Sequence, residues 1–216
     1  MGIVGWVAIS WWLAALPALA ATIEAGVKDE KGKAVDEAVV YLTSPPGTVA
    51  AQPKLATMDQ WDKEFIPYVL AVGTGTPVNF PNRDNIRHHV YSFSSPKKFE
   101  LPLYIGTPSS PLLFDKPGIV VLGCNIHDWM LAYVYVLTTP YFAKTGAEGR
   151  ARIVDVPPGA YEVRVWHPRQ KAASESTGQK VTLAQGGTGE ASFVVSLKRE
   201  WRPPRTTGKY DSQQQN

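Results

Sequence analysis

Short runs of β-branched and aromatic residues, separated by proline and glycine, recur through most of the chain and restrict what it can fold into. No stretch keeps the apolar period of a helix, and each run has the length of a strand. The sequence therefore predicts an all-β protein. The main predicted strands cover residues 65–72, 76–80, 88–93, 112–114, 118–122, 131–137, 152–156, 161–166, 180–183 and 191–197.

The start of the chain differs in composition from the rest. Residues 2–21 contain no charged side chain and end in the small-x-small pattern Ala18-Leu19-Ala20. This composition is typical of a secretory signal peptide, which we place at residues 1–21, with export to the periplasm. Because no Lys or Arg precedes the apolar run, an uncleaved membrane anchor stays open as the alternative. No later apolar run is long enough to span a bilayer.

The net charge of +3 comes from the end of the chain. From residue 198 onward, five basic residues stand against two acidic ones, and the remainder is balanced. No folded segment therefore carries the basic stripe of a nucleic-acid-binding protein, and we expect no nucleic-acid partner. The polar composition of residues 199–216, which close with Gln-Gln-Gln-Asn, predicts a disordered tail.

Cys124, His127 and Met130 form the pattern Cys-x-x-His-x-x-Met and include the only cysteine of the chain. A lone cysteine in an exported protein is a free thiol, an intermolecular link or a metal ligand. The neighbouring histidine and methionine favour a ligand. A thiolate, an imidazole and a weak thioether are ligands of a blue-copper electron-transfer site, which needs one further imidazole.

Two adjacent histidines, His88 and His89, open a predicted strand upstream and could supply that imidazole. Neighbouring side chains on a strand point to opposite faces. Only one of the two can therefore reach a metal ion held by Cys124, and the residues alone leave open which one it is.

The two segments resemble the cupredoxins, the family of type 1 blue copper proteins. Phe80-x-Asn82, followed by His88 and Val90, resembles the strand of the first histidine ligand in that family. The two-residue gaps after Cys124 resemble the ligand loop of amicyanin. Over its length the chain also resembles periplasmic cupredoxin-like proteins described as methylamine-utilisation-type.

The resemblance implies a Greek-key β-sandwich with one type 1 copper site. The implied ligands are His88, Cys124, His127 and Met130. His89 stands where the family usually has an asparagine that ties the two ligand loops together by hydrogen bonds. His89 is therefore expected to tie the two loops together. It would be the alternative ligand if a one-residue bulge in the strand turned His89, in place of His88, toward the metal.

Segments on either side of the predicted copper domain resemble a small carboxypeptidase-regulatory-like or prealbumin-type β-sandwich. The resemblance lies around residues 27–40 and in Pro157-Pro158-Gly159-x-Tyr161. Residues 23–27 and 38–42 flank a charged turn and predict a β-hairpin. We expect a cupredoxin domain at 55–140, inserted in or fused to an accessory sandwich formed by 22–44 and 146–198. A single enlarged sandwich is the competing layout.

Three functions fit these observations. The first is an electron carrier, not an enzyme, that moves single electrons between periplasmic redox proteins. The second is a periplasmic copper-binding protein for storage or delivery without redox shuttling. The third, an enzyme with Cys124 as nucleophile and His127 or His88 as base, fits least. Such pairs are generally assembled from distant segments, and the sequence offers no evident oxyanion site.

Overall fold

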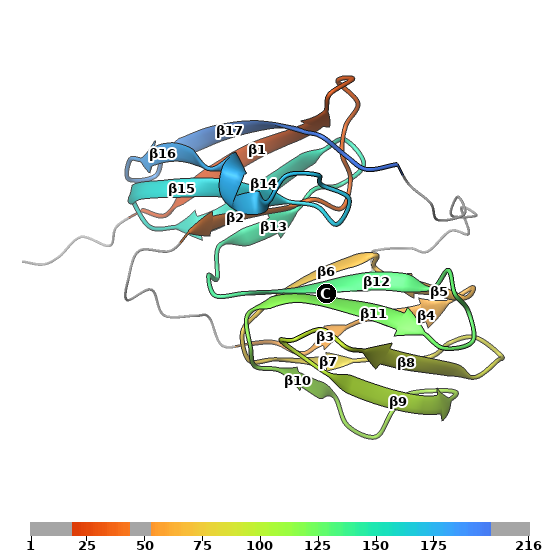
Figure 1. Cartoon of the computed structure of the whole chain (residues 1–216). Coiled ribbons are helices and arrows are strands. Elements are labelled where there is room, and N and C mark those ends of the chain that lie inside the picture. Colours follow the sequence, from red (N-terminus) through yellow and green to blue (C-terminus); the bar gives the residue numbers. More distant parts are fainter. Residues whose placement is uncertain (1–18, 44–52, 200–216) are drawn as a thin grey trace, which may run out of the picture.

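The computed structural model describes residues 19–43 and 53–199, and within these ranges its regular structure consists of strands and one short 3-10 turn (Figure 1). The all-β prediction is confirmed. Most of the predicted signal peptide and nearly all of the predicted tail lie outside the described residues, as does most of the predicted linker at 44–54. Within the described ranges, no helix has the length and apolar content needed to cross a membrane.

A central unit contains the strands between residues 56 and 137, which pair only with one another. A five-stranded sheet has the order β6-β12-β11-β8-β9, a three-stranded sheet has the order β10-β7-β3, and β4 pairs with β5. The strands are β3 (Ala56–Thr57), β4 (Asp59–Trp61), β5 (Glu64–Ile66), β6 (Val69–Gly73), β7 (Thr76–Asn79), β8 (His88–Ser92), β9 (Phe99–Tyr104), β10 (Leu112–Phe114), β11 (Gly118–Cys124) and β12 (Leu131–Leu137).

The core of the central unit lies between its sheets. Along β12, buried side chains alternate with partly exposed ones, as expected for a strand with one face in a core. The inward residues Ala132, Val134 and Val136 pack in one cluster with Phe80 and Phe114 from the opposite side. Cys124 and Met130 belong to the same cluster, so the end of β11 and the loop after it sit at the edge of this core.

A flanking unit contains the strands before residue 44 and after residue 141. One sheet has the order β14-β1-β17 and the other β13-β2-β15-β16. The elements are β1 (Ala21–Asp29), β2 (Val39–Thr43), β13 (Phe142–Lys144), β14 (Arg150–Val156), β15 (Gly159–Trp166), the 3-10 turn η1 (Ser174–Thr177), β16 (Gln179–Leu183) and β17 (Thr188–Val195). Tyr161 is buried, and its hydroxyl donates to the Pro157 carbonyl at 2.9 Å, as expected for the Pro-Pro-Gly-x-Tyr turn.

The predicted hairpin of residues 23–27 and 38–42 is wrong. β1 pairs with β14 and β17, whereas β2 pairs with β13 and β15, so the two strands lie in different sheets of the flanking unit. The charged turn reverses the chain, but only one isolated bridge, Lys28 to Ala34, follows it. β13, between the expected boundaries at 140 and 146, pairs with β2 and so extends the flanking unit.

An aromatic interface joins the two units. Between ring centroids, Trp166 of the flanking unit lies 6.0 Å from Tyr133 and 4.9 Å from Tyr135, and Tyr41 lies 5.7 Å from Tyr135. These rings belong to a buried cluster with contributions from both units. The flanking unit therefore covers part of the outer face of the five-stranded sheet.

An ion pair of the flanking unit also binds the edge of that sheet. β6 is an edge strand, and Val69 directs its backbone N–H and C=O away from β12. Glu37 accepts from this N–H at 3.1 Å, Lys144 donates to this C=O at 2.9 Å, and the two side chains are 2.8 Å apart. The pair satisfies the two outward backbone groups of Val69, which would otherwise need water or another strand.

Replacing Lys144 tests whether this ion pair fixes the two units together. Lys144→Ala leaves the Val69 carbonyl and the Glu37 carboxylate with fewer partners, and we expect a loss of about 1–2 kcal/mol in the free energy of unfolding. A urea titration followed by tryptophan fluorescence measures it. Lys180→Ala, which removes an exposed lysine of β16, is the matched control, and an equal midpoint for the two variants would contradict the role of the pair.

Candidate metal centre

Two neighbouring strands bring Cys124 and His88 together. β11 pairs antiparallel with β8, so that Cys124 lies opposite Val90 and Gly123 opposite Tyr91. Side chains of β8 alternate between buried and partly exposed, and His88 is on the buried face. The Tyr91 ring packs against Gly123, since a Cβ on that glycine would lie 2.8 Å from the ring. A glycine before the cysteine leaves room for this ring.

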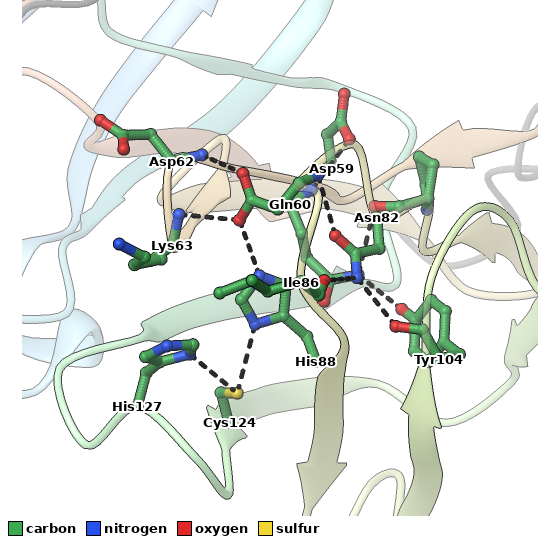
Figure 2. Close-up of polar contacts among 12 residues, drawn as sticks. Asp59, Gln60, Asp62, Lys63, Asn82, Ile86, His88, Tyr104, Cys124 and His127 are labelled. Atoms are coloured by element: carbon green, nitrogen blue, oxygen red, sulfur yellow. Dashed lines mark hydrogen bonds and ion pairs between the residues drawn. The ribbon is translucent and has the colours of Figure 1, made fainter.

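His127 completes a compact group of three donors. One ligand atom each from His88, Cys124 and His127 all lie within 4.8 Å of one another. The Cys124 Sγ is 3.8 Å from the Nδ1 of His88 and 3.8 Å from the Nδ1 of His127 (Figure 2). Cys124 and His88 are buried, whereas His127 is partly exposed. A soft thiolate between two imidazole nitrogens is a donor set that copper takes.

Two methionines lie in the same core as the thiol. Met130 is buried, and its N–H donates to the His127 carbonyl at 3.0 Å, which closes the loop between β11 and β12. Met58 is also buried in this cluster, although it is remote in sequence. Met130 lies three residues after His127 in the sequence, and it stays a predicted ligand.

Asp84 binds Nε2 of His88, the ring nitrogen that does not face Cys124. Its Oδ2 lies 2.7 Å from the His88 Nε2, and its carboxylate accepts the N–H of Asp62 at 2.7 Å and of Lys63 at 2.9 Å (Figure 2). Burial acts to raise the pKa of Asp84, but the hydrogen bonds from His88 and from these two N–H groups hold it below its ordinary value. An ionised Asp84 accepts a hydrogen bond from the Nε2–H of His88, so the lone pair of Nδ1 faces the thiol.

Asp84 was not among the site residues predicted from the sequence. A signal was available, because a histidine that binds a metal usually donates its other N–H to a carboxylate or carbonyl. Asp84 stands four residues before His88 in a loop. Asn82 shapes that loop: its side chain donates to the Ile86 carbonyl at 2.9 Å and accepts the Asp84 N–H at 3.0 Å.

His89 points away from the three donors. Its Nε2 lies 2.9 Å from a carboxylate oxygen of Glu100 on β9. A hydrogen bond does join the two ligand loops at this residue, but it is a main-chain one: the Asn125 N–H donates to the His89 carbonyl at 3.1 Å. The imidazole expected to tie the loops together therefore binds elsewhere in the structure.

The electrostatics of His127 favour its neutral form. Burial, then the nearby His88 and the positive charge of Lys63, lower the pKa of His127 from its ordinary value. A neutral imidazole has a free lone pair for a metal ion. The ring is also 5.1 Å from the ring of Trp129, which is exposed together with Ile126. His127 thus links the buried thiol to an apolar part of the surface.

Comparison with known proteins returned solved structures only, since no family model and no curated protein matches the chain. A copper-containing nitrite reductase from Thermus scotoductus SA-01 is 28% identical, with 44% of this chain and 25% of that chain covered and a TM-score of 0.37. A purple cupredoxin from Nitrosopumilus maritimus is 21% identical, with 38% and 99% covered and a TM-score of 0.33. A reduced amicyanin variant is 22% identical, with 47% and 100% covered and a TM-score of 0.35.

These similarities cover less than half of this chain, and the chain spans about a quarter of the length of the nitrite reductase. Across residues 19–43 and 53–199 the chain has several packed sheets and no long helix, and a cysteine and a histidine lie at the adjoining ends of paired strands. Its fold is a cupredoxin-like β-sandwich, as the sequence predicts.

Proposed function

We propose that this chain is a type 1 copper protein that carries single electrons between periplasmic redox proteins. The observation that carries the proposal is the buried Cys124 Sγ, 3.8 Å from an Nδ1 of each of two histidines. His88, Cys124 and His127 would be the strong ligands and Met130 the axial one. Copper held there would supply a one-electron couple.

The positions of the side chains support electron transfer over chemistry on a substrate. His88 and Cys124 are buried, and only His127 reaches the surface. A buried thiol gives a substrate little access, whereas the edge of His127 offers an electron a short route out. Ile126 and Trp129, each more than two fifths exposed, give a partner an apolar surface next to that edge.

The rigidity of the donors also supports a carrier. His88 is held by Asp84, Cys124 lies at the end of a paired strand, and a hydrogen bond closes the loop of His127 and Met130. Donors fixed by the protein need little rearrangement when the charge of the ion changes. A carrier benefits from that property, since each transfer then has a lower barrier.

Addition of Cu(II) to the purified chain tests the proposal. We expect an intense thiolate-to-copper band in the visible spectrum and narrow hyperfine splitting in the electron paramagnetic resonance spectrum. Cys124→Ser removes the sulfur ligand and should abolish both signals. A colourless protein that binds only Cu(I) would instead favour copper storage or delivery.

The adjacent histidines provide a matched pair of variants. His88→Ala removes an imidazole that faces Cys124 and should abolish the thiolate-to-copper band. His89→Ala removes an imidazole bound to Glu100, and its main-chain link to Asn125 stays, so the band should persist. Loss of the band only in His89→Ala contradicts the ligand assignment.

The periplasmic location is part of the proposal and rests on the uncharged, apolar residues 2–21. Fractionation of cells that express the full chain tests it. We expect the folded protein in the periplasmic fraction, or in the membrane fraction if the segment is an anchor. Removal of residues 2–20 should leave the protein in the cytoplasm, and export of this truncated chain would contradict the proposal.

A further inference from the structure

The carboxylate of Asp84 is held in place independently of the histidine that it binds. Its Oδ1 accepts the N–H of Asp62 and its Oδ2 the N–H of Lys63, both in the turn between β4 and β5. Asp62 and Lys63 have φ values of +52° and +58°, so this turn directs two successive N–H groups toward one carboxylate. Asn82 accepts the backbone N–H of Asp84 as well.

The contact with His88 is short and protected from water. Oδ2 lies 2.7 Å from Nε2, with the His88 side chain fully buried and that of Asp84 11% exposed. A charge-assisted hydrogen bond of this kind is stronger than a neutral one, and a low local dielectric strengthens it further. His88 therefore cannot rotate or exchange its two nitrogens without breaking this bond.

The contact has two consequences for a metal ion at Nδ1. It fixes the proton on Nε2, which leaves the lone pair of Nδ1 toward the Cys124 sulfur, 3.8 Å away. It also places the negative charge of Asp84 one ring away from an ion that would be bound at Nδ1. A more highly charged ion gains more from that charge, so Cu(II) would be stabilised more than Cu(I).

We infer that Asp84 is a positioning residue that holds His88 in its Nδ1-donor form and lowers the reduction potential of the copper site; this inference rests on the proposed function. The residue acts through His88 and does not touch the ion. The hairpin of β4 and β5 serves as the support of Asp84, which gives this short two-stranded element a part in tuning the site.

Asp84→Asn tests the inference in the full chain. Asparagine keeps the shape and one acceptor oxygen but removes the charge. Competition with chelators measures the affinities for Cu(II) and Cu(I). We expect about a 10- to 100-fold loss for Cu(II) and less than about threefold for Cu(I). A tenfold fall in the ratio of the Cu(II) affinity to the Cu(I) affinity corresponds to a rise of about 59 mV in the reduction potential of a one-electron couple.

Asp62→Asn is the matched control. It makes the same charge change in an exposed side chain on the supporting turn, keeps the backbone N–H, and places at φ +52° a residue that tolerates this region. We expect its affinity ratio to stay within about twofold of the wild type, since its charge is screened by water. Equal ratios for Asp84→Asn and Asp62→Asn would overturn the inference.

A measurement on the metal-free wild type does not depend on any variant or on copper. Nitrogen-15 resonances of the His88 ring report which nitrogen carries the proton. We expect a protonated Nε2 and an unprotonated Nδ1; a proton on Nδ1, or rapid exchange between the two, overturns the inference. Absence of the thiolate-to-copper band in the wild type would refute the proposed function, whereas a normal band with an unchanged ratio in Asp84→Asn refutes only the part assigned to Asp84.

Discussion

The antiparallel pairing of β8 with β11 is the interaction on which the site depends. It sets Cys124 opposite Val90 and so brings the buried His88 to the thiol. Side chains on a strand alternate, so a shift of the pairing by one residue would present His89 in place of His88. The pairing of β8 with β9 does contain an irregularity between His88 and Val90, yet His88 keeps the buried face.

Behind the donors, a polar network fixes the loop that leads into β8. Gln60 donates to the Pro81 carbonyl at 3.1 Å, Asn82 spans the loop, and the Tyr104 hydroxyl donates to the Phe80 carbonyl at 2.7 Å. Burial raises the pKa of Tyr104 to about 12, which keeps its hydroxyl protonated as a donor. The flanking unit adds rigidity from outside by covering part of the five-stranded sheet. The site is thus supported by this network at the loop and by the flanking unit on the outer face of the sheet.

The local parts of this arrangement could be predicted from the sequence. Cys124, His127 and Met130 follow one another closely, so a short loop brings them together in any fold that ends a strand at Cys124. Because side chains alternate along a strand, only one of the two upstream histidines could reach the thiol. Which histidine does so depends on which face of β8 is buried, and that face is set by pairing with strands far away in the chain.

Non-local pairing also explains the wrong hairpin prediction. The turn after β1 has the composition of a hairpin turn, but β1 pairs with residues more than 120 positions away. A local sequence pattern contains no information on such a pairing. β9 was not among the predicted strands. It contains Pro102, and it lies at the edge of its sheet, where proline is tolerated. Asp84 was recognisable in principle, since a carboxylate near a histidine ligand is common.

The proposed site requires the folded chain to present one sulfur and two imidazoles to a single copper ion in both of its oxidation states. X-ray absorption spectroscopy of the copper-loaded protein, first oxidised and then reduced, measures this ligand set. We expect one short copper–sulfur contact and two imidazole nitrogens in both states, with little change between them. A shell of oxygen ligands, or a ligand set that changes on reduction, would refute the proposed site.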